Sequence, residues 1–364
     1  MLIVDAHEDL AWNVLTFGRD YTRSASEIRH HERETRSPAP QHNGDTLLGW
    51  DDYQQGQVGI VFGTLFAAPA RKSMGTWDHF TYQNPEEAHR KYMSMLDVYH
   101  QWTDEHPDKF KLIQTQQHLA DVLSPWEREP LSKPPVGLVV LMEGAEGVRE
   151  PAELEAWWGR GVRIIGPAWV GTRFCGGTGE PGPLTRDGYA LLEAMDAFGF
   201  TLDVSHMDAR AALQSLDVYQ GQIIASHANA KTVLKGSSSN RHLTDDIIRG
   251  LIERNGVIGV VPYNRFLQHG WTRSDGKEAV GLDALIAQID YICQMAGNAN
   301  HVGIGSDFDG GLGWQHVPRE LNTIADLQKI PALLYEKGYD EGDVTAIMGG
   351  NWIAMLEHTL PETV

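Results

Sequence analysis

Seven polar side chains in this 364-residue chain lie at or just after the ends of short apolar runs, and their types suit a metal centre. They are His7, Asp9, Glu143, His206, His227, Tyr263 and Asp307. Imidazole nitrogen and carboxylate oxygen are the usual ligands of Zn²⁺ and similar divalent ions. A buried carboxylate without a compensating charge is costly, so three at one place indicate bound cations. The set therefore predicts a metal site.

Eight short apolar runs supply the elements that position these side chains. The runs are residues 2–6, 58–66, 136–142, 162–167, 200–205, 222–226, 256–262 and 301–306. Such runs, separated by longer amphipathic stretches, are typical of buried parallel strands joined by helices. Eight of them predict an α/β fold, a (β/α)₈ TIM barrel, in which the chemistry lies at the C-terminal ends of the strands. We expect one barrel domain over residues 1–364.

One ion is expected to take its ligands from the first and third runs. Alternate residues of a strand face the same side, so His7 and Asp9 can both reach the barrel mouth while Glu8 points away. Glu143 stands in LMEGAEG, where small neighbours leave room for a carboxylate that bridges two ions. His7, Asp9 and Glu143 are therefore the predicted ligands of this ion.

A second ion is expected between Glu143, His206 and His227. The two histidines end the similar motifs DVSH and IASH on consecutive runs. Two divalent ions, typically about 3.5–4 Å apart, generate hydroxide from a shared water near neutral pH and polarise a carbonyl. Asp307, in GIGSDFDG, is placed to accept the proton of that water and pass it to a leaving amine.

Charge and cysteine content restrict the classes of partner and the compartment. Lys and Arg total 30 against 49 Asp and Glu, a formal net charge of −19. Such a chain repels polyanions, so nucleic acid and anionic membranes are not expected partners. Two cysteines are too few for a disulfide framework and fit a reducing compartment. With neither a signal peptide nor a membrane span in the pattern, we expect a cytoplasmic protein.

Two polar segments border the expected site. Residues 19–45 interrupt the connection after the first strand, as an inserted loop that is either a solvated insertion or a lid or dimer arm. Its histidines, His30, His31 and His42, are expected at the surface rather than as ligands. Residues 171–183, with FCGGTGEPGP, are expected to form a flexible loop beside the site, and no GK[ST] follows GGTG to make it a phosphate loop.

Apolar residues at helical spacing predict helices between the runs. The clearest is residues 85–106, where Tyr92, Leu96 and Tyr99 recur on one face that would pack on the barrel. Further helices are predicted at residues 186–198, 208–216, 245–255, 282–295 and 325–338.

The motifs together resemble those of one known family. They are DAHEDLAW, EGAEG, GVRIIGPAW, FTLDVSH, IIASHANA, NRHLTDD, GIGSDFDG and GGNWIAMLE. With them the chain resembles, over nearly its whole length, the renal (membrane) dipeptidase family of binuclear zinc peptidases, within the amidohydrolase-like barrels. Many sister amidohydrolases use HxH and a carboxylated lysine instead of HxD with a bridging glutamate, and no lysine follows any of the eight runs.

The resemblance implies hydrolysis of dipeptides, often with tolerance of a D-residue at the C-terminal position, and a homodimer. It implies two Zn²⁺ ions, with five metal ligands: His7, Asp9, Glu143, His206 and His227. Asp307 matches the acid/base. Arg241, in SNRHLTDD, matches a clamp for the C-terminal carboxylate of the substrate, for which a guanidinium is a bidentate partner. Tyr263 matches a substrate-contacting position.

One position departs from the family. The fourth strand of the family ends in a histidine that contacts the scissile carbonyl oxygen, and the matching residue here is Trp169. An indole N–H donates a hydrogen bond but carries no positive charge. Three alternatives follow: a metallo-dipeptidase, a binuclear hydrolase of N-acyl amino acids or other small amides, and a non-catalytic binding relative. The presence of Asp307 argues against the last, since a binding protein needs no general base.

Overall fold

The strands form a barrel, as the eight apolar runs predict. A computed structural model describes residues 1–127 and 133–363. Its central strands are β1 (Ile3–Glu8), β2 (Val58–Phe66), β6 (Val136–Glu143), β7 (Val162–Gly166), β10 (Thr201–Asp203), β11 (Ile223–Ile224), β12 (Ile258–Val260) and β13 (Val302–Ile304). They are parallel and ordered β11-β10-β7-β6-β2-β1-β13-β12, and a parallel bridge between Ala225 and Ile258 joins the two ends. The (β/α)₈ prediction is confirmed.

Burial on both faces explains why the strands are continuous apolar runs. All eight residues of β6 are buried, and the side chains of β1 are buried along its whole length. The first and last strands are neighbours, with Asp5 of β1 opposite Ile304 of β13. This pairing brings the C-terminal ends of β1 and β13 together, although some 300 residues separate them in the chain. An extra short strand, β5 (Phe110–Leu112), pairs with the start of β6.

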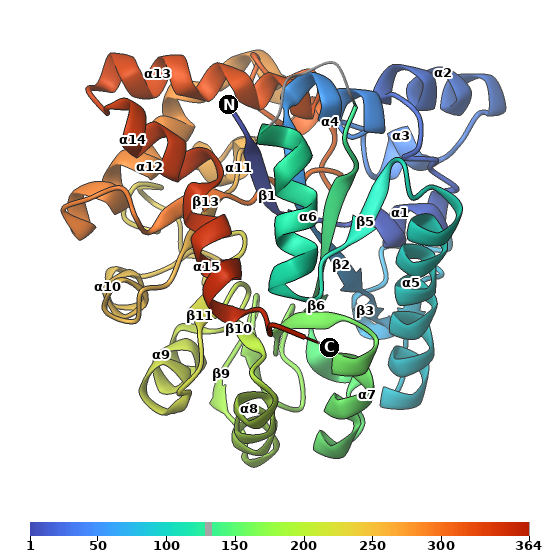
Figure 1. Ribbon diagram of the computed structural model, residues 1–364, viewed down its shortest axis with the longest axis vertical. Helices are drawn as coiled ribbons and strands as arrows, with labels where there is room; N and C mark the ends of the chain where they lie inside the picture. The colour runs from blue at the N-terminus through green and yellow to red at the C-terminus, as the bar shows by residue number, and fades with distance from the viewer. Residues whose placement is uncertain (128–132, 364) are drawn as a thin grey trace.

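Helices surround the barrel (Figure 1). They include α1 (Leu10–Phe17), α4 (Trp50–Gly56), α5 (Pro85–Glu105), α6 (Gln116–Glu127), α7 (Leu154–Gly159), α8 (Arg186–Phe198), α9 (Ala209–Val218), α10 (Asp245–Glu253), α11 (Asn264–Leu267), α12 (Leu282–Ala296), α13 (Ile330–Lys337), α14 (Glu341–Thr345) and α15 (Asn351–Thr359). Five predicted helices correspond to α5, α8, α9, α10 and α12. The sixth, residues 325–338, begins instead as a 3₁₀ segment and becomes α-helical only at Ile330. Pro331 explains the break, because proline lacks a backbone N–H and is favoured in the first turn of an α-helix.

Residues 19–45 are not the simple inserted loop that their composition predicts. They contain α2 (Ala25–Thr35) and α3 (Ala39–His42), which lie together at one corner of the molecule in Figure 1. The side chain of Ser24 caps α2 in a reciprocal capping box with Glu27. Arg19 and Glu32 are buried, so part of the segment belongs to the protein interior.

The prediction of a flexible loop at residues 171–183 is also wrong. It contains an antiparallel hairpin of β8 (Cys175–Gly177) and β9 (Glu180–Leu184), whose tip is close to the end of β10. A second small sheet pairs β3 (Ala68–Pro69) with β4 (Thr81–Tyr82), and the loop between them reaches the barrel mouth. Cys175 and Cys293 are both free, buried thiols.

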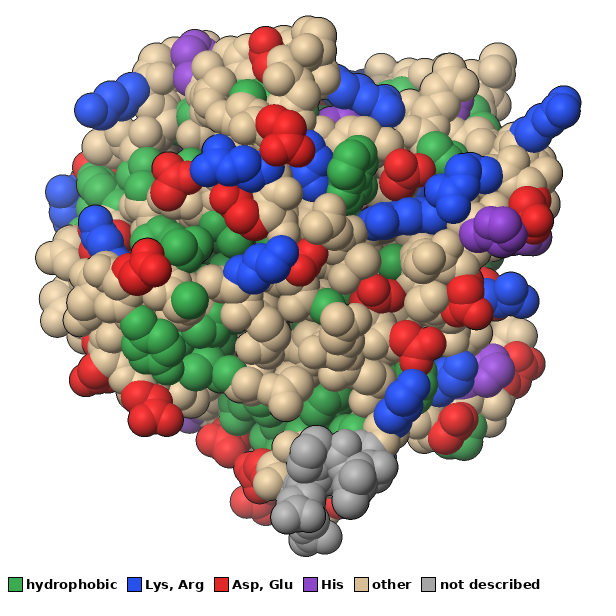
Figure 2. All heavy atoms as spheres, turned by 90° about the horizontal axis from the view of Figure 1, so that it is seen from above, with side chains coloured by type: hydrophobic (Ala, Val, Ile, Leu, Met, Phe, Trp, Pro, Cys, Tyr) green, Lys and Arg blue, Asp and Glu red, His purple; other side chains and the backbone are tan. Residues whose placement is uncertain are grey.

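The surface is mixed in charge. On the face shown in Figure 2, acidic and basic side chains are interspersed, with apolar side chains between them. Among residues 1–127 and 133–363, no helix combines the length and apolarity that a bilayer crossing requires.

Candidate active site

The predicted ligands converge on Glu143, at the end of β6. One carboxylate oxygen, Oε2, lies 3.5 Å from Nε2 of His7. The other, Oε1, lies 3.0 Å from Nε2 of His206 and 3.6 Å from Nε2 of His227. A single carboxylate therefore faces histidines from three other strands, and its two oxygens are divided between two sides of the cluster. This is the arrangement expected of a bridging ligand.

The ligand atoms form compact groups of the size that a metal ion needs. Within each group all atoms lie within 4.8 Å of one another; the groups are His7–Asp9–Glu143, Glu143–His206–His227 and His7–His227–Asp307. The first two are the sets expected for the two ions, and the third adds Asp307. Nε2 of His7 is buried and makes no hydrogen bond to any described residue. A lone pair in that position suits a cation, and the donor set fits Zn²⁺.

Hydroxyl groups orient the histidines. The Thr178 hydroxyl, at the tip of the β8–β9 hairpin, lies 3.0 Å from Nδ1 of His206. The Ser226 hydroxyl lies 2.8 Å from Nδ1 of His227 and donates to the carboxylate of Asp203. With Nδ1 engaged, each ring directs Nε2 into the cluster, as partners behind metal-bound histidines usually do. Sequence reasoning missed these partners, because a threonine in a glycine-rich hairpin carries no metal signal of its own.

Asp9 and Asp307 complete the cluster from β1 and β13. The Thr64 hydroxyl of β2 donates to Oδ1 of Asp9. Oδ1 of Asp307 lies 4.0 Å from Nε2 of His7. Asp307 has a positive φ of 59°, which is uncommon outside glycine and concentrates at functional sites. Its placement is therefore maintained by the surrounding structure rather than by local preference.

The buried carboxylates of the cluster favour the binding of a cation. Burial raises the pKa of Asp9 to about 6 and raises the pKa of Asp307 well above its usual range. Burial opposes protonation of His7, but Glu143 and the neighbouring aspartates outweigh it and raise the pKa of His7 to about 9. Asp9 and Asp307 thus tend to hold protons, or to place one on His7. A divalent cation supplies the same compensation and keeps the carboxylates ionised.

A cavity of about 180 Å³ opens over this cluster. Three further predicted residues line it: Trp169 after β7, Arg241 after β11 and Tyr263 after β12. Arg241 is buried, and its Nη2 donates to the carbonyl oxygen of His227 over 2.7 Å. Its Nε and Nη1 have no partner among the described residues. Lining residues that were not predicted are Trp12, Phe66, Ala68, Lys72, Met74, Asp78, Phe266, Gly310, Gly311 and Leu312.

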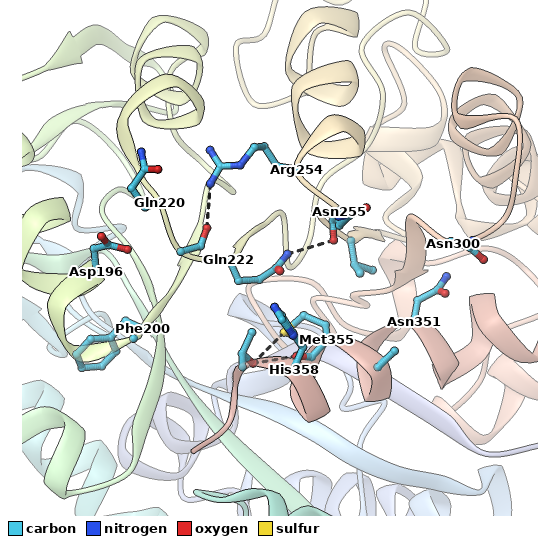
Figure 3. A pocket seen from close by; sticks show the side chains of 15 residues that line it. Asp196, Phe200, Gln220, Gln222, Arg254, Asn255, Asn300, Asn351, Met355 and His358 are labelled. Atoms are coloured by element: carbon cyan, nitrogen blue, oxygen red, sulfur yellow. Dashed lines mark hydrogen bonds between the residues drawn. The ribbon is translucent and has the colours of Figure 1, made fainter. Parts of the chain in front are cut away.

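A larger cavity of about 760 Å³ lies at the opposite, N-terminal end of the barrel (Figure 3). Several of its polar side chains already donate to backbone carbonyl groups. Arg254 donates to the carbonyl oxygens of Leu216, Tyr219 and Gly221, and Gln222 donates to that of Asn255. These side chains tie the ends of helices and strands together, so the chemistry belongs to the smaller cavity.

Comparison with known proteins agrees with the site. A sequence model described as membrane dipeptidase (peptidase family M19) matches residues 1–360. The chain belongs to this family. It is therefore a metallo-dipeptidase, an enzyme of dipeptide hydrolysis. The family resemblance drawn from the motifs is confirmed.

Several relatives share much of the chain. An uncharacterized protein in the pqqA 5′ region of Klebsiella pneumoniae is 33% identical over 61% of this chain and 82% of its own length. An uncharacterized dipeptidase, C965.12, of Schizosaccharomyces pombe is 26% identical over 77% of this chain, and the match spans only 64% of that protein. Dipeptidase aclJ of Aspergillus oryzae is 22% identical over 97% of this chain and 77% of its own length.

Solved structures share the fold. A metallo peptidase from Rhodobacter sphaeroides, crystallised with a phosphinate mimic of the dipeptide L-Ala-D-Ala, has a TM-score of 0.77 at 23% identity, covering 99% of both chains. The probable dipeptidase PvdM from Pseudomonas aeruginosa has a TM-score of 0.78 at 18% identity, covering 99% of this chain and 96% of that one. At these identities the likeness establishes the barrel alone.

Proposed function

We propose that the enzyme cleaves dipeptides, including those with a C-terminal D-residue, at two Zn²⁺ ions held by His7, Asp9, Glu143, His206 and His227. The observation that carries the proposal is the division of the two Glu143 oxygens between His7 on one side and the histidine pair on the other. When bound, such ions lower the pKa of water and polarise a carbonyl. A matched library of L-Xaa-L-Xaa and L-Xaa-D-Xaa dipeptides tests the substrate class, and turnover of neither set would refute it.

Asp307 is the proposed acid/base. It lines the cavity and faces His7 without occupying the centre of the cluster. Burial raises the pKa of its carboxyl group, which makes the carboxylate a better proton acceptor than an exposed aspartate. In the proposed reaction Asp307 takes the proton of the attacking water and delivers it to the amine nitrogen that leaves.

Arg241 is the proposed contact for the free carboxylate of the substrate. Two of its guanidinium nitrogens have no partner within the described residues, although the side chain is buried in the cavity wall. A planar carboxylate can pair with both. This end of the cavity lies beyond β11, on the far side of the barrel from β2. A substrate anchored at Arg241 therefore extends across Glu143 towards the side chains after β2 and β7.

We expect Arg241→Ala to weaken binding of dipeptides with a free carboxylate and to have little effect on C-terminally amidated analogues. The loss of a charge-assisted bidentate contact should raise KM or lower kcat/KM by roughly 10²-fold, since hydrogen bonds to charged groups contribute about 1.5–3 kcal/mol. Steady-state kinetics on matched acid and amide substrates measure the difference. Arg249→Ala, at an exposed arginine of α10, is the control for charge alone. Equal losses for both substrate classes would show that Arg241 only supports its loop.

Trp169 is the proposed apolar wall of the pocket. Its ring packs edge-on against Phe66 with centroids 5.1 Å apart, and Trp12 lines the same cavity. The Trp169 centroid is 6.4 Å from that of His206, so the indole flanks the ligand cluster. An aromatic wall at this end favours an apolar side chain on the N-terminal residue of the dipeptide.

We expect Trp169→Phe to retain most of the activity, because the wall remains apolar and polarisation of the carbonyl would come from the metal ions when these are bound. Trp169→His should improve turnover of simple dipeptides, and Trp169→Ala should mainly change the preference among N-terminal residues. A panel of dipeptides differing only in that residue gives the measurement. A hundredfold fall in kcat for Trp169→Phe at unchanged metal content would instead assign the indole N–H a role in catalysis.

A second candidate keeps the metals and replaces the substrate with an N-acyl amino acid or another small amide. Trp169 favours it, because an aromatic wall accepts an acyl chain as well as an apolar side chain. N-acyl amino acids tested beside the dipeptides decide between the two.

Tyr263, half-buried in the cavity wall, is proposed to contact either substrate. A cytoplasmic location and a homodimer stay predictions, to be tested by fractionation and by light scattering.

A further inference from the structure

The turn that carries Asp307 is held from outside by a second aspartate, Asp309. Its carboxylate is completely buried, two residues beyond Asp307. Four donors from one part of the chain satisfy it. They are Arg19 Nη1 at 3.0 Å, Tyr21 Oη at 2.7 Å, the Leu47 backbone N–H at 3.0 Å and the Thr46 hydroxyl. All four lie within or directly beside the 19–45 segment, so the partner of the Asp307 turn is the insertion.

The backbone of the same turn is anchored as well. The carbonyl oxygen of Asp309 accepts hydrogen bonds from Nδ2 of Asn13 and Nδ2 of Asn43, each at 2.8 Å. Asp307 and Asp309 both have left-handed backbones, with φ of 59° and 62°. Such conformations are costly for residues other than glycine and persist only when neighbouring contacts impose them. Here six contacts do so, two to the carbonyl oxygen and four to the carboxylate.

Arg19 connects the turn to the helix of the insertion. Its Nη1 faces Asp309, and its Nε donates to Oε1 of Glu32 on α2 over 2.8 Å. The three side chains are buried together. Burial opposes the charge on Arg19, but Asp309 and Glu32 outweigh it and raise the pKa of the guanidinium, so it stays ionised. One arginine is thus shared by two carboxylates, of which only Asp309 belongs to the Asp307 turn.

We propose that residues 19–45 are a clamp that positions Asp307, and that Asp309 is the positioning residue through which the clamp acts. This inference rests on the proposed role of Asp307 as acid/base. It assigns the insertion a part in turnover, in place of a solvated loop, a lid or a dimer arm. If the clamp is loosened, the turn can relax from its left-handed backbone and carry the Asp307 carboxylate away from the cluster. A displacement of about 1 Å can cost as much as 10²-fold in rate.

Asp309→Asn and Glu32→Gln form a matched pair that tests the clamp. Each removes one carboxylate from Arg19 and leaves it the other, so the loss of ion pairing is similar. Asparagine also tolerates a positive φ. We expect Asp309→Asn to lower kcat about 10- to 100-fold, with a smaller change in KM and full metal content. Glu32→Gln, which removes the single contact of Glu32 to Arg19, should lower Tm and leave kcat close to that of the parent enzyme, because Asp309 keeps its four donors.

A double-mutant cycle separates positioning from general destabilisation. In the Asp307→Asn background, Asp309→Asn should cause little further loss of residual turnover. The reason is that Asp309 is proposed to act by positioning the Asp307 carboxylate, which this background already lacks. Equal fold-losses in both backgrounds, or equal kcat in the matched pair, would overturn the clamp. Tyr21→Phe, which removes one donor to Asp309 and leaves the ion pair, replaces Asp309→Asn in the cycle should that variant not fold.

The same set distinguishes failure of the clamp from failure of the proposed function. A normal kcat in Asp309→Asn beside a severely impaired Asp307→Asn would remove the clamp and leave the acid/base assignment intact. A normal kcat in Asp307→Asn would remove both.

Discussion

Exhaustive chelation should reduce dipeptide hydrolysis to background, and Zn²⁺ should restore it. The undenatured enzyme should contain close to two ions per chain, because two separate sets of ligand atoms share Glu143. The physical reason is charge: burial makes it costly for Asp9 and Asp307 to ionise, so the cluster is built for a cation. Elemental analysis and activity, followed together during chelation and reconstitution, give the result.

Glu143→Gln sharpens the metal prediction. An amide offers a neutral oxygen and a nitrogen where two anionic oxygens now face the histidines, so affinity at both sites should fall together. A variant of Asp9 should weaken one site and leave the second ion bound. An enzyme that keeps full activity after losing all metal would contradict the assignment. So would loss of a single ion in Glu143→Gln.

The barrel and the convergence of its polar strand ends were accessible from sequence for one physical reason. A strand buried on both faces is a continuous apolar run, and a parallel barrel brings the end of every such run to one rim. β1, β6 and β13 therefore bring His7, Glu143 and Asp307 within reach of one another although they are far apart in the chain. Neither step requires knowledge of any side-chain contact.

Polar contacts between distant segments were not accessible in this way. Asn13 and Asp309 are 296 residues apart, and no periodicity in the sequence marks either as a partner of the other. The charged composition of residues 19–45 predicts exposure, but fewer than half of these residues are exposed. Among its charged residues, Arg19 and Glu32 are buried, because each neutralises another charge inside the protein. Composition averages over a segment and hides the few residues that matter to the site.

The hairpin within residues 171–183 was missed for a third reason. Residues 171–183 contain five glycines, which predict flexibility, but glycine also permits the close approach of two strands. Gly176 packs directly against the backbone of Gly182 in the β8–β9 hairpin, where a Cβ atom would collide. The hairpin in turn places Thr178 behind His206. The glycines here allow two strands to pack closely instead of making the segment flexible. Because the hairpin was not predicted, the contact of Thr178 with His206 was not predicted either.

Asp307→Asn should retain both ions and lose about 10²–10⁴-fold in kcat, the usual cost of removing a general acid/base. The amide keeps the shape of the side chain but cannot take up the proton of the attacking water. Asp307 faces His7 at 4.0 Å, a longer separation than that between Glu143 and the histidines, so the metals should depend on it less. Steady-state kcat and metal content, measured on the same preparation, check both halves of the prediction.

Asp78→Asn is the control for this last substitution, since Asp78 lines the same cavity but belongs to none of the ligand groups. Its carboxylate accepts a hydrogen bond from the Met74 backbone N–H over 2.9 Å, a contact that an amide oxygen can replace. Near-normal kcat in Asp78→Asn beside a large loss in Asp307→Asn would locate the proton transfer at the end of β13. If Asp307→Asn turned over normally with both ions bound, another group would have to move the proton. If it lost activity in step with metal, Asp307 would be a ligand instead, as its grouping with His7 and His227 allows.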